Sequence, residues 1–119
     1  MTRYNIQMSD IYVHVAHILI FSTFLGYIGI EQAKMPKYLY PVILSTGIIV
    51  IMYHIYKSIF KKDAWINYIH ILLVGPALVY VGFYKEETPR KAFELILMFA
   101  FASLGYHGYY LFKAMNKIE

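Results

Sequence analysis

The chain contains no cysteine and few charged residues, and both absences narrow what it can be. Without cysteine it has no disulfide scaffold, no thiolate metal site and no thiol catalysis. Only 15 % of its 119 residues are charged, whereas 60 % are hydrophobic, and the mean hydropathy is +0.50. This balance is too apolar for an ordinary soluble domain.

Catalytic signatures are also missing from the sequence. There is no Ser-His-Asp set, no pair of carboxylates inside an apolar run, no H-E-x-x-H motif and no glycine-rich phosphate loop. The G-x-x-G pieces at Gly26 to Gly29 and Gly105 to Gly108 are better explained by close helix packing. These absences favour a non-enzymatic protein.

The apolar residues are gathered into four long runs, each near the ~20 residues that cross a bilayer core. The runs extend roughly from Ile11 to Ile30, Tyr38 to Phe60, Ala64 to Tyr84 and Ala92 to Phe112. A soluble four-helix bundle would carry a charged stripe along every helix, but here most charges lie between the runs or at their ends. The sequence predicts an all-α, four-helix transmembrane up-and-down bundle, forming a single integral membrane domain over residues 1–119.

The sequence also repeats itself at a constant offset of 53 residues, with His17 to Lys62 aligning without a gap on His70 to Met115. Tyr53-His54-x-Tyr56 falls on Tyr106-His107-x-Tyr109. With repeat 1 at about residues 10–62 and repeat 2 at about 63–115, each repeat holds two runs. We therefore expect two tandem helical hairpins of the same orientation, related by a pseudo-two-fold axis along the membrane normal.

Short connections and one internal proline add two local expectations. Connections of about three to six residues make consecutive helices antiparallel neighbours. Pro76 lies mid-span in the third run, so it predicts a kink or a free carbonyl near Leu72.

Four histidines recur at equivalent positions of the two repeats. His17 and His70 lie about six residues into helices that run one way, whereas His54 and His107 lie about six residues before the ends of helices that run the other way. At 1.5 Å per residue, all four lie roughly 9 Å inside the same membrane face. We predict an intramembrane polar belt at this depth, comprising His17, His54, His70 and His107 with Tyr53, Tyr106, His14 and Asn67.

Helix periodicity predicts that His54, His70 and His107 point into the bundle, because the helix faces that carry them also carry small or polar residues. The stripe of His17 instead carries Phe21 and Phe24, which leaves its orientation open. A separate small-residue face of the first helix is predicted to contact a second subunit in a homo-oligomer; it comprises Ser22, Gly26 and Gly29.

Four functions stay open for the belt. Two imidazoles at one depth can be the axial ligands of haem b, with His54 and His107, or His17 and His70, as diagonal pairs. Three or four imidazoles can hold a divalent metal, although no carboxylate lies nearby to support them. A small channel or transporter can pass protons or other ions, because histidine changes charge near neutrality. Hydrogen bonds across helices, worth about 1 kcal/mol each, suit a structural or interaction component, which the sequence favours.

Charge and topology identify the lipid bilayer as the main partner. The chain has a formal charge of +4, but its basic residues flank the runs without forming a block, which argues against nucleic acid and for lipid headgroups. An even number of spans puts both termini on one side. That side carries six basic residues against five on the other, which favours cytoplasmic termini.

Parts of the second hairpin resemble small uncharacterised multi-pass proteins of large DNA viruses of algae and protists. The resemblance rests on His70-Ile-Leu-Leu-Val-Gly-Pro-Ala-Leu-Val-Tyr-Val-Gly, then Thr88-Pro89, then Leu104-Gly105-Tyr106-His107-Gly108-Tyr109. It implies a viral or host-cell membrane setting and brings no activity and no site residues.

Overall fold

The computed structural model describes residues 11–61 and 65–118, and this part of the chain is almost entirely helical. The four long helices are confirmed, close to the ranges of the apolar runs: Ile11–Lys34, Leu39–Phe60, Trp65–Glu87 and Arg90–Asn116 are each long and apolar enough to cross a membrane. Their elements are η1 (His17–Ser22), α2 (Thr23–Glu31), η2 (Gln32–Lys34), α3 (Leu39–Phe60), α4 (Trp65–Ile69), η3 (His70–Val74), α5 (Gly75–Tyr84), η4 (Lys85–Glu87) and α6 (Arg90–Ile118).

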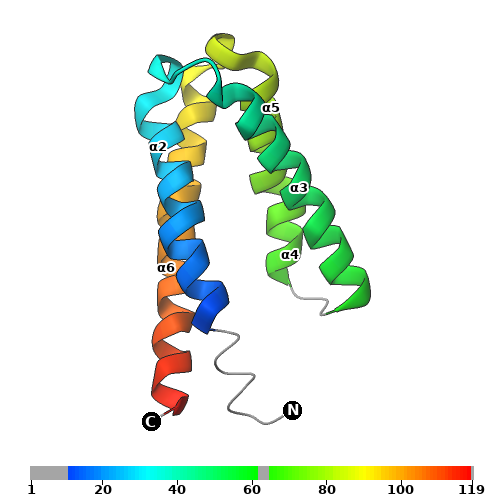
Figure 1. The fold of residues 1–119 in the computed structure, drawn as a ribbon, viewed down its shortest axis with the longest axis vertical. Coiled ribbons are helices and arrows are strands. Elements are labelled where there is room, and N and C mark those ends of the chain that lie inside the picture. Colours follow the sequence, from blue (N-terminus) through cyan, green and yellow to red (C-terminus); the bar gives the residue numbers. More distant parts are fainter. Residues whose placement is uncertain (1–10, 62–64, 119) are drawn as a thin grey trace.

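The helices pack as two pairs. The N-terminal helix lies along α6, and α3 lies along η3 and α5. The pairs meet at the end that holds η2 and η4, called the apex below, and diverge toward the end where α6 finishes (Figure 1). The expectation that all consecutive helices pack along each other is therefore wrong for the first and third connections, which join helices of different pairs. A short connection holds two helix ends together without bringing the sides of the helices into contact along their length.

Glycines allow each pair to pack closely. A Cβ added at Gly29 would lie 2.5 Å from Leu97 Cβ and 2.7 Å from Leu97 Cα on α6. A Cβ added at Gly82 would lie 2.6 Å from the same two atoms of Leu44 on α3. Van der Waals contact between carbons needs about 3.5–4.0 Å, so only glycine permits these backbone approaches. Gly29 and Gly82 are 53 positions apart, as are Leu44 and Leu97.

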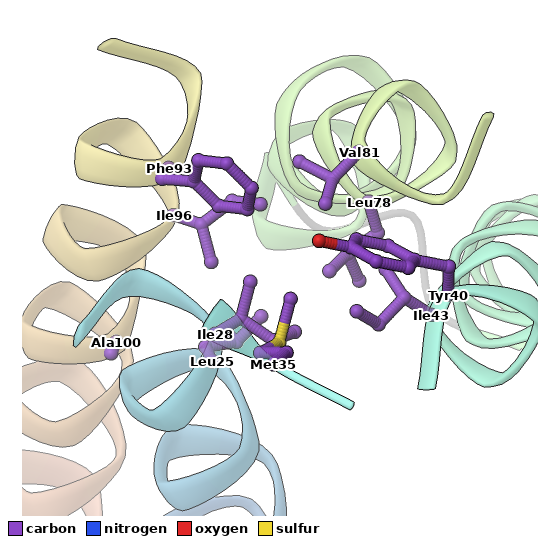
Figure 2. Close-up of a cluster of buried hydrophobic side chains, with 10 residues drawn as sticks. All are labelled: Leu25, Ile28, Met35, Tyr40, Ile43, Leu78, Val81, Phe93, Ile96 and Ala100. Carbon is purple, nitrogen blue, oxygen red and sulfur yellow. The ribbon is translucent and has the colours of Figure 1, made fainter. Parts of the chain in front are cut away.

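The apex holds the core that joins the two pairs (Figure 2). Figure 2 shows side chains from α2, α3, α5, α6 and the connection after η2 converging there. Its members are Leu25, Ile28, Met35, Tyr40, Ile43, Leu78, Val81, Phe93, Ile96 and Ala100. Eight of them form pairs separated by 53 positions: Leu25 with Leu78, Ile28 with Val81, Tyr40 with Phe93, and Ile43 with Ile96.

The turns at the apex share an unusual backbone conformation. Gln32 has φ 54° and ψ −131°, and Lys85, 53 positions later, has φ 55° and ψ −128°. They are the only non-glycine residues with positive φ in the described part of the chain. Such a backbone is costly for a side chain with a Cβ, by about 1–3 kcal/mol, and persists where the surrounding packing enforces it.

Two π-helical segments interrupt the first and third helices. They begin at His17 and at His70, again 53 positions apart. The disturbance expected from Pro76 is present as η3, which ends two residues before it. Because η1 forms without a proline, proline is not the shared cause. What both segments share is a histidine at their first residue.

Tyr40→Phe is expected to raise the free energy of unfolding by about 1 kcal/mol. The Tyr40 hydroxyl is buried and has no hydrogen-bond partner among the described residues, and the equivalent position holds Phe93. Removing a buried, unpaired hydroxyl relieves a desolvation cost. Thermal unfolding in detergent measures the change, with Tyr84→Phe, whose side chain is 48 % exposed, as the unaffected control. A loss of stability in Tyr40→Phe would instead show that the hydroxyl is paired.

Candidate functional site

A cavity of about 610 Å³ lies between the two helix pairs. It extends from Leu25 and Leu78, in the apex core, to Trp65 and Tyr106. Its wall is mainly aliphatic and aromatic, and it includes one histidine from each of the four long helices. Of the predicted belt, His17, His54, His70, His107, Tyr53 and Tyr106 line the cavity.

The four cavity histidines form a continuous series of ring contacts. His54 stacks on His70 with a centroid distance of 4.1 Å and an interplanar angle of 19°. His17 stacks on His107 with 4.3 Å and 28°. His17 and His70 then meet across the two helix pairs at 6.4 Å, with their planes at 86°. His17, whose orientation the sequence left open, therefore lies at the centre of the group.

Backbone carbonyls fix two of these rings. His17 Nδ1 lies 2.8 Å from the Val13 carbonyl oxygen, and His70 Nδ1 lies 2.8 Å from that of Ile66. A carbonyl oxygen can only accept, so each Nδ1 carries the proton and donates it, leaving the Nε2 lone pair free. In a regular α-helix the same carbonyl would accept from the backbone N–H of the histidine itself, so the side chain competes with the helical ladder where the π-helix starts.

The other two histidines are held by side chains. His54 Nδ1 lies 2.9 Å from Asn67 Oδ1, and His107 Nδ1 lies 2.8 Å from His14 Nδ1. These two contacts are related by the 53-residue offset, since Asn67 is equivalent to His14 and His107 to His54. His54 and His107 are also equally buried, with 6 % of each side chain exposed. Asn67 and His14 thus hold His54 and His107 in place without lining the cavity themselves.

No protein-family model matches the chain, and no curated protein or solved structure is significantly similar to it. What the site can bind therefore has to be argued from its own residues. Among the described residues, no group of three or more histidines or carboxylates is placed to hold a metal ion.

The small-residue face of the first helix packs within the chain. Ser22 Oγ donates to Ser103 Oγ of α6 at 2.9 Å. A Cβ at Gly26 would lie 3.8 Å from Ala100 Cβ, and Gly29 contacts the backbone of Leu97. In this arrangement α6 occupies the face assigned to a second subunit, so self-association, which stays a prediction, would use another surface.

Trp65 is the main cavity residue that the sequence did not reveal. Tryptophans near the ends of membrane helices usually lie at the interface, yet Trp65 lines the cavity and meets Tyr106 of α6 edge to face at 5.7 Å. One sequence signal could have identified Trp65. It lies one helical turn before Ile69, which precedes His70 and also lines the cavity. The π-helix then shifts the lining face along the third helix, to Val74 and Leu78.

Proposed function

We propose that the chain is a four-span integral membrane protein of two tandem helical-hairpin repeats, in which the first helix of each repeat packs on the second helix of the other. Both termini are placed in the cytoplasm. The four helices have the length and hydropathy of membrane spans. Large apolar side chains also cover their outer faces: Leu19, Ile59, Leu72 and Phe101 are each more than 60 % exposed. Such a surface suits lipid and would aggregate in water.

The tandem arrangement is supported by contacts that recur at the 53-residue offset. Gly29 against Leu97 matches Gly82 against Leu44. The strained turns, the π-helix starts and the histidine hydrogen bonds recur in the same way. The viral or host-cell membrane setting implied by the sequence resemblance is retained as part of this proposal.

The protein is further proposed to bind an apolar ligand between its two helix pairs. The observation that carries this is the cavity between the pairs, lined by one histidine from each long helix. Its volume lies within the roughly 300–1,000 Å³ of ligand pockets, which are mostly apolar with a few convergent polar groups. A purely structural role explains the hydrogen bond between His54 and Asn67, but it leaves the cavity without a purpose.

Trp65 provides the test, because it is the only tryptophan of the chain and lines the cavity. Metal-free protoporphyrin, a flat and largely apolar probe, should quench Trp65 fluorescence saturably when it is titrated into the protein in nanodiscs. Ala102→Phe places a ring in the cavity wall and should weaken this binding at least about tenfold, or 1.4 kcal/mol.

Met98→Phe is the matched control, since Met98 lies on the same helix, is 64 % exposed and is not part of the cavity wall. It should bind the probe like the unmodified chain. Quenching that does not saturate, or that is the same in all three proteins, would mean that the probe dissolves in the lipid, and it would overturn the ligand-binding role.

A further inference from the structure

His17 and His70 differ from the other two cavity histidines in what their rings are free to do. Each projects from the first residue of a π-helix, and each donates Nδ1–H to a backbone carbonyl. A histidine held in this way has the tautomer and the fixed ring that metal-ligating histidines show, with Nε2 as the ligand atom. π-Helical turns are themselves frequent at functional sites.

The spacing of these two rings fits one metal ion between them. An imidazole nitrogen binds a first-row metal at about 2.0 Å, so two rings that ligate one ion from opposite sides have centroids about 6.3 Å apart. The His17 and His70 centroids are 6.4 Å apart. The stacked pairs, His54 with His70 and His17 with His107, are too close at 4.1 and 4.3 Å to hold an ion between them.

Two protein ligands alone do not complete a metal site. Transition-metal sites in proteins commonly have four to six ligands, and the described residues place no third histidine or carboxylate to share an ion with this pair. The missing donors must therefore come with the ligand. A planar macrocycle with four nitrogens around the metal supplies them, and it requires an apolar cavity of the kind found here.

The charge at the outer end of the cavity suits the carboxylates of such a macrocycle. Lys57 lies one turn after Tyr53, a cavity residue, with its Nζ 5.7 Å from the centre of the Tyr53 ring. A basic group at one end and aliphatic side chains at the other match the polar and apolar edges of haem b.

We infer that the cavity binds haem b, with His17 and His70 as its two axial ligands. This inference rests on the ligand-binding role proposed above. His54 and His107, which stack on the two ligating rings, are positioning residues, and they in turn are held by Asn67 and His14. The assignment selects one of the two diagonal pairs that the sequence left open.

Reconstitution of the purified chain with ferric haem in nanodiscs tests the inference. The absorption spectrum should become that of a six-coordinate low-spin haem. Because the two imidazole planes are nearly perpendicular, at 86°, the low-temperature EPR spectrum should be of the strongly anisotropic low-spin type rather than the rhombic type given by parallel planes. His17→Ala and His70→Ala should each abolish the low-spin signature, and added imidazole should restore it.

His54→Phe and His107→Phe separate positioning residues from ligands, since each keeps a ring for stacking but removes the nitrogens: both should retain six-coordinate low-spin haem but bind it more weakly. Met98→Phe, outside the cavity wall, is the unaffected control. If the low-spin signature were lost in His54→Phe and His107→Phe but kept in His17→Ala and His70→Ala, the choice of ligands would be overturned. If protoporphyrin quenches Trp65 saturably in every variant but ferric haem gives the same spectrum as in empty nanodiscs, haem ligation is overturned while the ligand-binding role stands.

Discussion

Gly82→Ala is expected to lower the free energy of unfolding by about 3 kcal/mol, the upper end of the cost of overpacking. The added Cβ would lie 2.6 Å from Cα, Cβ and N of Leu44. The backbone fixes the positions of these atoms, so they cannot rotate away. α3 and α5 must therefore separate by about 1 Å to restore an ordinary van der Waals distance. In a membrane such packing is the main force between helices, and the loss extends along the whole pair. Thermal unfolding in detergent measures it.

Gly29→Ala should produce a loss of similar size in the other pair, since its Cβ would meet Leu97 in the same way. Gly105→Ala and Gly108→Ala are the controls, because a Cβ at either position has no neighbour within 4 Å. The close helix packing expected from their G-x-x-G spacing is therefore wrong for Gly105 and Gly108. The two control variants should be unchanged or more stable by up to about 1 kcal/mol. Equal stability of Gly82→Ala and Gly105→Ala would contradict the close pairing of α3 and α5.

Phe93→Ala is expected to cost about 2–3 kcal/mol, through the cavity that it leaves in the apex. Phe93 is 1 % exposed and lies between α6 and α5 in the core that joins the two helix pairs (Figure 2). In water the cost would include the transfer of the ring, but a span that unfolds within lipid keeps its apolar surroundings, so the lost packing dominates. Unfolding in detergent, followed through Trp65 fluorescence, reports the change.

Phe101→Ala provides the comparison for this substitution. Phe101 lies on the same helix but is 66 % exposed, so removal of its ring should change the free energy of unfolding little. Phe93→Ala should in addition weaken protoporphyrin binding, because the apex sets the spacing of the pairs on either side of the cavity. If Phe93→Ala and Phe101→Ala were equally stable, the apex would not be the core that joins the pairs.

The sequence predicted the helices well because their signal is local. Apolar runs and intervening charges mark each span, so the second run, at 38–60, differs from α3 (Leu39–Phe60) by one residue. The pairing of the helices was not predicted in full, because a short connection restricts only the two ends that it joins. The partner of each helix wall is instead decided by Gly29 and Gly82, whose opposite residues, Leu97 and Leu44, are far away in sequence.

The candidate site was predicted as a set of residues but not as an arrangement. The repeat selected His17, His54, His70 and His107, and all four line the cavity. The sequence left the orientation of His17 open because its stripe carries Phe21 and Phe24 rather than small or polar residues, yet both of these rings line the cavity with it. The hydrogen bonds that distinguish His17 and His70 from the other two also depend on ring geometry, which no sequence pattern encodes.

The apex core joins the two helix pairs at one end, so a rotation of one pair against the other would pivot there. Trp65 and Tyr106 touch near the other end of the pairs, on the far side of the cavity from the apex. That end lies about 20 Å from the pivot, so a rotation of about 5° at the pivot separates the two pairs there by nearly 2 Å. Such a rotation would change the width of the cavity at that end while every helical hydrogen bond stayed intact, so the packing of the apex controls the separation of the two pairs.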